Sequence, residues 1–566
     1  MSKSNRTDMT TNVPVSPHNR WGDMCAFAAL IIAVACGIWP LWTPGWPFNH
    51  EELYFTQRAG VFAAHFNQGD WLPLWASADN RGFGSPQPAL YHKLFSFVSG
   101  AAYWLGHDMK LALMMTTAFF LFIGAGGMRF LLRTLGAGRI SGLAGGICLI
   151  FANYTATNWL VRGALAEFSG AMLVPWGMAF FLRVIHRKRR TKDAIALGLC
   201  FSLLFLAHSV LAYFLVLLLP VLAVALWGGW GLRLERGLTS RLILASGITL
   251  LLLTPVLFAM LQLGHAYDLT RILPSKYLPA NQLQPLSRYF WDSYVFGHDF
   301  RAYTIQLDTV PLAVALLGGT WLLCARLHAP EAWAMLLLVA VILLLQTRVG
   351  VLVYTALPGG NYIQFPWRLM AVATPCLIAA AVLILSRFAL AAGWGEGGAA
   401  ATALIMAALC IPHSGSLSKL DYGRYSAQEL ATWQTRPVVF SLFGEYLPRM
   451  FPLTYGALDP EPWALRQGCQ IKEEGDSSLF EPLSRHFVTE CAGKAILALP
   501  LFGSPYHGLM VNGQSATCQN LAELPGLCAM AVPAGTSEIE VRIPTFNSLL
   551  KTWGVLGAEG RQATDS

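Results

Sequence analysis

Long apolar runs separated by short basic segments constrain the fold of this chain more than any other feature. A helix that crosses a bilayer needs about twenty mainly apolar residues, and such runs recur between residues 24 and 412. Only 12% of the 566 residues are charged and 55% are hydrophobic, whereas about a quarter of residues are charged in soluble domains. The sequence therefore predicts an α-helical polytopic membrane protein.

Basic clusters between the apolar runs set the orientation. Short loops rich in Lys and Arg stay in the cytoplasm, and the strongest such cluster is 183–192. This rule predicts about eleven spans, with the N-terminus inside and the C-terminus outside. It also makes the run 194–230 cross twice, with an external turn at 207–209. The net charge of +8 belongs to these loops, so we expect no nucleic-acid binding.

The same pattern divides the chain into three parts. Residues 1–23 form a polar cytoplasmic tail, residues 24–412 the transmembrane domain, and residues 413–566 an external β-rich domain in which short alternating strands predict a β-sandwich. The transmembrane domain carries a first external loop at 44–108 and a second at 263–308. The apolar segment 94–105 is too short to cross and is expected to lie along the membrane surface.

The cysteines separate by environment. Seven of the 11 lie in apolar runs, where a thiol usually acts as a small hydrophobe. The other four are in the external domain, and an even number there predicts two disulfides in an oxidising compartment. Four cysteines allow three pairings, and the sequence does not choose among them. These four are Cys469, Cys491, Cys518 and Cys528.

Three ionisable residues follow the first span directly: His50, Glu51 and Glu52. A carboxylate near the membrane interface can take a proton from an acceptor hydroxyl, and burial or a neighbouring His would tune its pKa. The alternative is a solvated helix N-terminus, where carboxylates meet the helix dipole favourably. The sequence therefore offers these residues as a candidate catalytic group.

Three arginines on the same side are candidate phosphate ligands. Arg58 lies seven residues after Glu51, so both can share a helical face, but Arg58 could equally sit at the interface. Arg162 could pair with Glu167 to fix a loop, or bind phosphate with that acid orienting it. Arg368 could clamp a phosphate or anchor a helix end by snorkelling.

Other polar residues on the external side complete the candidate substrate site. His208, at the turn between two spans, could also be a helix-end hydrogen-bonding residue. A divalent cation is a weaker expectation, based on Asp292, His298 and Asp299, and no His/Cys metal spacing, P-loop or Ser-His-Asp arrangement is convincing. The remaining candidates for substrate or phosphate binding are Tyr91, Lys93, Glu167 and Gln364.

Several short motifs, in order, give the chain a family resemblance. In the first external loop these are His50-Glu51, Arg58, GDWLPLW at 69–75, NRGFGSP at 80–86 and Tyr91; later ones are RGALAEF at 162–168, AHS at 207–209, IQFPWR at 363–368 and GEYLP at 444–448. The chain resembles the GT-C glycosyltransferase superfamily of membrane proteins. Within it, the chain looks like the branch labelled 6-pyruvoyl-tetrahydropterin synthase-related membrane proteins, with kinship to the YfhO-like group.

The resemblance implies a polyprenyl-phosphate-linked sugar as donor, inverting transfer on the external face and a catalytic carboxylate in the first external loop. The family position is commonly an Asp after His; here it is Glu51, which leaves Glu52 as an alternative. The implied acceptor is an external glycan, lipid or protein, and the implied location is a cell inner membrane with the C-terminal domain outside, in the periplasm.

Two other functions use the same residues. A transporter or flippase of a lipid-linked glycan would need the cationic groups but not the Glu51 carboxylate. A non-catalytic scaffold would depend on the β domain, binding glycan or a partner there. Replacing Glu51 by Gln and deleting residues 413–566 separate the three functions.

Overall fold

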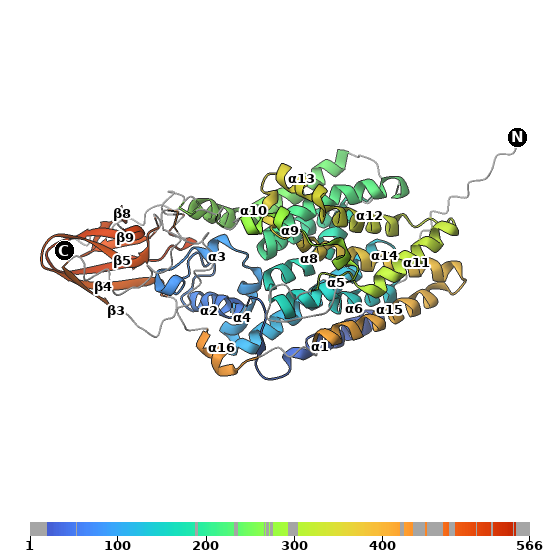
Figure 1. Ribbon diagram of the computed structural model, residues 1–566, viewed down its shortest axis with the longest axis horizontal. Coiled ribbons are helices and arrows are strands. Elements are labelled where there is room, and N and C mark those ends of the chain that lie inside the picture. The colour runs from blue at the N-terminus through green and yellow to red at the C-terminus, as the bar shows by residue number, and fades with distance from the viewer. Residues whose placement is uncertain are drawn as a thin grey trace.

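The computed structural model joins a large helical body to a smaller β domain at the C-terminal end (Figure 1). It describes residues 20–51, 54–186, 191–230, 236–264, 266–267, 271, 275–291, 304–418, 424–433, 448–449, 468–474, 482–504, 507–521, 524–546, 548 and 550. The helices are α1 (Arg20–Gly37), α2 (Tyr54–Asn67), α3 (Gln87–Leu90), α4 (Leu94–Gly106), α5 (Met109–Thr134), α6 (Arg139–Ile150), α7 (Asn153–Ala156), α8 (Leu165–Ile185), α9 (Thr191–Trp230), α10 (Arg236–Gly264), α11 (Thr309–Cys324), α12 (Pro330–Leu345), α13 (Arg348–Ala356), α14 (Met370–Ala391), α15 (Gly395–Ser418) and α16 (Ala427–Trp433).

Among the described residues, five helices are long and apolar enough to cross a membrane, or up to seven if each bent helix pair is one span. The five lie in α5, α8, α9, α10 and α14, and four shorter apolar helices accompany them at Met24–Gly37, Leu94–Gly106, Thr309–Cys324 and Gly395–Ile411. The chain is therefore a multi-pass membrane protein. The predicted number of eleven spans is not confirmed by this count.

Helix α9 folds back on itself. Its backbone leaves helical geometry at His208, with φ −162° and ψ 96°. Both of its ends lie at the same end of α8: Asp193 pairs with Arg183 at 2.8 Å, and Trp230 lies 5.0 Å from the His186 ring, centroid to centroid. A straight helix of this length could not place both ends there. The 40 residues thus form a helical hairpin turning at the place that the charge pattern predicts.

Helix α14 lies at the centre of the helical body. The most apolar part of the span Pro366–Ala391 is 89% buried, and Ala379, Ala380 and Ala381 are fully buried. A helix that is apolar all round has to be covered by other helices, and α14 packs against α12, α15, α11, α6 and α8. The loop that precedes this fixed helix carries Arg368.

The β domain has two antiparallel sheets. One has the strand order β3 (Cys469–Glu474), β4 (Ser484–Cys491), β10 (Gly535–Arg542), β6 (Gly508–Val511) and β7 (Gln514–Ala516); the other has β5 (Ala495–Phe502), β9 (Leu524–Val532) and β8 (Gln519–Leu521). Both sheets contribute to one buried core, with Phe487 and Val541 from the first sheet and Leu497 and Met530 from the second. This is the sandwich arrangement that the alternating strands predict. A separate pair, β1 (Trp46–Pro47) and β2 (Arg424–Tyr425), joins the first external loop to the chain after α15.

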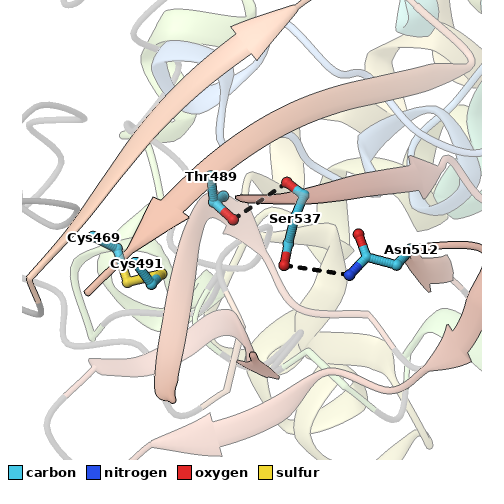
Figure 2. Close-up of a disulfide and its surroundings, with 5 residues drawn as sticks. All are labelled: Cys469, Thr489, Cys491, Asn512 and Ser537. Atoms are coloured by element: carbon cyan, nitrogen blue, oxygen red, sulfur yellow. Dashed lines mark hydrogen bonds between the residues drawn. A yellow bond between two sulfur atoms is a disulfide. The ribbon is translucent and has the colours of Figure 1, made fainter. Parts of the chain in front are cut away.

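Two disulfides close this domain, as predicted, and the structure selects their pairing: Cys469 with Cys491 and Cys518 with Cys528. Cys469 and Cys491 lie opposite each other on β3 and β4. Figure 2 shows this bridge beside the buried hydroxyl of Thr489, which donates to the Ser537 carbonyl at 3.4 Å.

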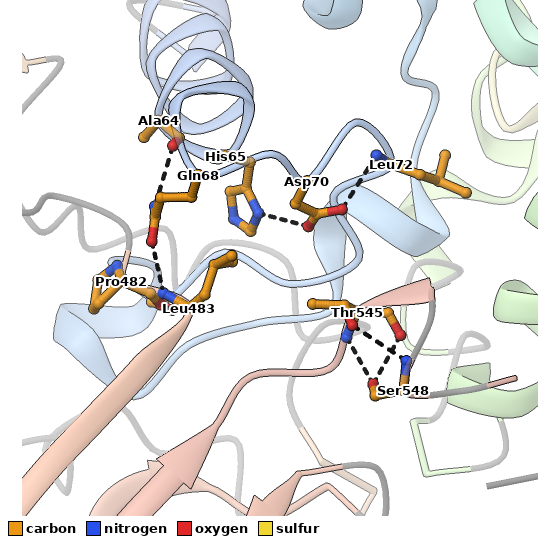
Figure 3. A network of polar contacts seen from close by, with 10 residues as sticks. Ala64, His65, Gln68, Asp70, Leu72, Pro482, Leu483, Thr545 and Ser548 are labelled. Atoms are coloured by element: carbon orange, nitrogen blue, oxygen red, sulfur yellow. Dashed lines mark hydrogen bonds and ion pairs between the residues drawn. The ribbon is translucent and has the colours of Figure 1, made fainter. Parts of the chain in front are cut away.

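The β domain docks on the first external loop. The backbone N–H of Phe502 donates to the Phe83 carbonyl at 2.9 Å, and Arg485 Nη1 donates to the Gly82 carbonyl at 2.7 Å. Figure 3 shows a second contact, in which Gln68 Oε1 accepts from the Leu483 N–H at 3.1 Å. The loop that leads to the candidate site is thus held between the helical body and the sandwich.

Candidate active site

Backbone pairing places the loop after α1 against the end of a π-helix, Thr157–Arg162. The N–H of His50 donates to the Val161 carbonyl at 3.2 Å, and the N–H of Glu51 donates to the Arg162 carbonyl at 3.0 Å. Gly163 makes this close approach possible, because its φ is +66° and an added Cβ would lie 2.3 Å from the Asn49 side chain. Glu51 is therefore held beside Arg162 by main-chain contacts.

A buried acid joins two arginines. Glu167, 2% exposed, accepts from Arg162 Nη1 at 3.0 Å and from Nη2 at 3.1 Å. Arg368 Nε lies 3.3 Å from its second oxygen, and the Tyr154 hydroxyl donates to its first at 2.6 Å. Of the two roles that the sequence allows for Arg162 and Glu167, the structure shows the ion pair, and it brings Arg368 to the same carboxylate.

The Glu51 carboxylate is in a different state from that of Glu167. Within the part of the chain that the structure describes, it has no hydrogen-bond or ion-pair partner within 4 Å. Burial raises the pKa of Glu51, the positive charges of Arg162 and Arg368 oppose that rise, and the charge of Glu167 adds to it. A carboxylate that is unengaged and has a raised pKa is suited to accept a proton.

The segment before α14 holds both arginines with its own groups. Arg368 Nη1 donates to the Ile363 carbonyl and to Gln364 Oε1, both at 3.2 Å. The guanidinium carbon of Arg368 lies 4.9 Å from the centre of the Phe365 ring, and that of Arg162 lies 4.5 Å from the Trp367 ring. Arg368 Nη2 has no hydrogen-bond partner among the described residues, and 17% of this side chain is exposed.

Two histidines stack within the field of the arginines. The rings of His92 and His208 are 4.3 Å apart and 5° from parallel, and His92 Nε2 lies 3.0 Å from Ser209 Oγ. Burial lowers the pKa of His92 to about 3, so its ring is neutral near pH 7. Tyr91, the residue before His92, is partly exposed. Burial together with the charges of Tyr54 and Glu51 raises the pKa of Tyr91.

Lys93 lies next to His92 in the chain and contacts the main chain of α3. Its Nζ donates to the Ala89 carbonyl at 3.3 Å, and burial lowers its pKa to about 7. It lines a small cavity with His92, Ser209 and Met260. The contacts shown for Lys93 are thus with the Ala89 carbonyl and this cavity.

Arg58 does not occupy the position expected of a phosphate ligand. Its guanidinium is 2% exposed and pairs with Asp79, also 2% exposed, at 3.0 Å. The guanidinium carbon lies 4.9 Å from the centre of the Tyr54 ring, and Gln57 Nε2 donates to the other oxygen of Asp79 at 3.2 Å. The structure thus shows Arg58 in a buried ion pair with the loop that follows α2.

Some sequence candidates fall outside the described residues. These are Glu52, the alternative to Glu51, and the possible cation ligands Asp292, His298 and Asp299. In the described parts of the chain, no group of three or more His, Cys, Asp or Glu side chains is arranged to hold a metal ion.

Several residues of this site were not predicted from the sequence: Asn49, Tyr154, Asn158 and Trp367 beside the arginines, His92 beside His208, and Asp79 beside Arg58. Asn158 accepts from Arg162 Nη1. Two of them were within reach, because His92 lies between the named residues Tyr91 and Lys93, and Trp367 directly precedes Arg368. Asn158 was within reach as well, since it lies four residues before Arg162. The others carry no local signal, because their partners are more than ten residues away.

Comparison with known proteins finds no matching family and no matching curated protein. Solved structures that match include the oligosaccharyltransferase of Archaeoglobus fulgidus, at 14% identity over 72% of this chain and 57% of that chain, with a TM-score of 0.45. Others are the arabinofuranosyltransferase AftD from Mycobacteria, at 18% identity over 70% and 26% with a TM-score of 0.45, and ArnT from Cupriavidus metallidurans, at 14% identity over 75% and 78% with a TM-score of 0.36. The chain spans little more than half of the oligosaccharyltransferase. At these identities and scores the likenesses carry no functional conclusion, so the function rests on the site.

Proposed function

We propose that this chain is a membrane glycosyltransferase that moves a sugar from a polyprenyl-phosphate donor to an external glycan, lipid or protein acceptor, with inversion at the anomeric carbon. The motifs of the first external loop and the IQFPWR segment support membership of the GT-C superfamily, in its pterin-synthase-related branch. The same motifs support an inner-membrane location with the β domain outside.

Glu51 is the general base in this proposal. Its carboxylate takes the proton of the acceptor hydroxyl as that oxygen attacks the anomeric carbon of the donor. The bond between the anomeric carbon and the phosphate oxygen breaks, and its electron pair stays on the departing polyprenyl phosphate. Positive charge placed where negative charge develops lowers the barrier to such a step.

Arg368 is the candidate contact for that phosphate. Its Nη2 is not committed to any described residue, whereas Nη1 and Nε face groups of the protein. Arg162 acts through its field, because its two terminal nitrogens are taken up by Asn158 and Glu167. Tyr91, partly exposed near Glu51, is a candidate contact for the sugar.

One observation carries the proposal. Two carboxylates lie beside the same pair of arginines, and the oxygens of one are fully engaged in hydrogen bonds and ion pairs while those of the other are not. Glu167 binds both guanidinium groups and a tyrosine hydroxyl. Protonation of Glu167 would weaken these contacts, so it is a poor proton acceptor. Glu51 lies within the field of both arginines and leaves its oxygens available. Two carboxylates whose surroundings differ in this way can take different roles in acid–base chemistry.

The test uses purified full-length protein in vesicles with a panel of polyprenyl-phosphate sugars. Wild type should consume at least one donor, and Glu51→Gln should reduce kcat by roughly a hundredfold or more, the range for removing a general base. Glu538→Gln, an exposed glutamate of β10, is the matched control and should be unchanged. Glu51→Gln with full turnover would reject the proposal. Movement of the lipid-linked glycan without donor cleavage, unaffected by Glu51→Gln, would identify a flippase instead.

A further inference from the structure

The backbone at Gln364 adopts a conformation that L residues rarely hold. Its φ is +56° and its ψ is −59°, and the N–H of Phe365 donates to the Ile363 carbonyl at 2.5 Å. A hydrogen bond between residues two apart around such a centre is a γ-turn of the rare, strained kind. Strained residues persist where the surrounding structure over-determines them, and they cluster at functional sites.

The turn has one clear consequence for the site. It places two acceptors of adjacent residues, the Ile363 carbonyl and Gln364 Oε1, at the same distance of 3.2 Å from Arg368 Nη1. In an extended segment, successive carbonyl and side-chain groups point in different directions. The reversal at Gln364 is what allows both to reach one nitrogen.

The remaining contacts of Arg368 complete a cradle. Glu167 faces its Nε, and the Phe365 ring lies against its guanidinium plane. A planar guanidinium contacted at two of its nitrogens and on one face keeps a single orientation. The nitrogen that remains, Nη2, has no hydrogen-bond partner among the described residues.

We infer that Gln364 is a positioning residue: its strained turn orients Arg368 before the donor binds, so that Nη2 meets the departing phosphate without reorganisation. This inference rests on the proposed function and names the residue that sets the geometry of its phosphate contact. Pre-ordering of this kind matters because a small misplacement of a charge-stabilising group costs a large factor in rate.

Three substitutions separate backbone strain from the side-chain contact. Gln364→Gly relieves the positive φ and removes the amide. Gln364→Ala keeps the strain and removes the amide. Gln364→Glu keeps the reach but adds a negative charge that competes with the donor phosphate for Arg368. His107→Gly is the matched control, since His107 also has a positive φ, +54°, and is exposed at the end of α4.

The experiment measures thermal midpoint, binding of a short-chain polyprenyl phosphate and kcat/KM for the sugar donor. Gln364→Gly should raise the midpoint, as His107→Gly does, yet lower kcat/KM by roughly ten- to a hundredfold and weaken polyprenyl-phosphate binding. Gln364→Ala should lower kcat/KM less than Gly does and leave the midpoint at or below that of wild type. Gln364→Glu should weaken phosphate binding most.

Wild-type kcat/KM and binding in Gln364→Gly would overturn the positioning role. If wild type binds polyprenyl phosphate but transfers no sugar, the proposed function fails, while weaker binding in Gln364→Gly still supports the role of Gln364. If wild type does not bind polyprenyl phosphate, both inferences fail.

Discussion

Glu51 and Arg162, more than a hundred residues apart in the chain, are joined by a main-chain hydrogen bond of 3.0 Å from the Glu51 N–H to the Arg162 carbonyl. This contact sets a free carboxylate next to a guanidinium that is already neutralised by Glu167. The formal charges of the two acids and two arginines cancel. Under the proposed function, the donor phosphate would meet the arginines and the acceptor would meet the base in this one region. The predictions below follow from that arrangement.

Substitutions of Glu51 and Glu167 should both abolish transfer but have opposite effects on stability. Glu167→Gln weakens a buried network that holds two arginines, and breaking a buried ion pair typically costs about 3 to 5 kcal/mol. Glu51→Gln removes a carboxylate that has no partner among the described residues, so it should leave the protein at least as stable as wild type. Thermal unfolding in detergent, run beside the donor assay, checks both. A large loss of stability in Glu51→Gln would show that the acid is structural.

The pH dependence of transfer should show an acid limb set by Glu51. Its pKa is raised by burial, so the carboxyl takes up its proton above the value of an ordinary glutamate, about 4.3. Because the base must be ionised, kcat/KM should fall as pH falls through that raised pKa. The folded protein binds this proton more tightly than the unfolded chain, so ionised Glu51 costs stability above the raised pKa, and that cost disappears as pH falls below it. A pH profile of kcat/KM with no limb above about 4.3 would contradict the assignment.

Arg58 and Asp79 should behave as a structural pair. Removing either partner leaves a buried charge, and Arg58→Ala or Asp79→Ala should each lower the free energy of unfolding by about 3 to 5 kcal/mol. The double variant Arg58→Met with Asp79→Leu leaves no unpaired charge and should lose less than the sum of the single variants. Donor KM measured on the folded fraction should stay near that of wild type. A selective rise in donor KM for Arg58→Met, with unchanged stability, would restore Arg58 as a phosphate ligand.

Arg485 should couple the β domain to the first external loop. It pairs with Glu473 at 2.7 Å and donates to the Gly82 carbonyl, three residues from Asp79. Arg485→Ala should loosen this junction and expose the loop at 68–85 to proteases, while each disulfide stays closed. Limited proteolysis with mass spectrometry locates the cleavage. Arg542→Ala, an exposed arginine of β10 paired only locally with Glu540 at 2.7 Å, is the control and should not change the pattern.

Much of the architecture follows from local sequence rules. The apolar runs predicted a multi-pass helical body, the basic clusters predicted the reversal at 207–209, and four cysteines predicted two disulfides in the external domain. Burying about twenty apolar residues in lipid or in a helix bundle is a property of each segment alone. Alternation with period two likewise marks a strand before its partner is known.

The site was only partly predictable for the same physical reason. The sequence singled out Glu51, Arg162, Glu167 and Arg368 because ionisable groups near a membrane are energetically costly and are functional or paired by default. Their division of roles was not, since it depends on which arginine reaches which acid. Arg58 illustrates the point: its spacing from Glu51 allows a shared face, but in the folded chain it is buried in an ion pair with Asp79.

The sequence by itself determined that the chain is a multi-pass membrane protein with a C-terminal β domain closed by disulfides, because hydropathy and strand alternation act residue by residue. Only the tertiary structure decided that Glu167 forms ion pairs with two arginines while the Glu51 carboxylate forms none with the described residues. It also decided that the backbone turns at Gln364, whose side chain accepts a hydrogen bond from Arg368. Those outcomes depend on distances between segments far apart in the chain, and such distances exist only once the helices have packed.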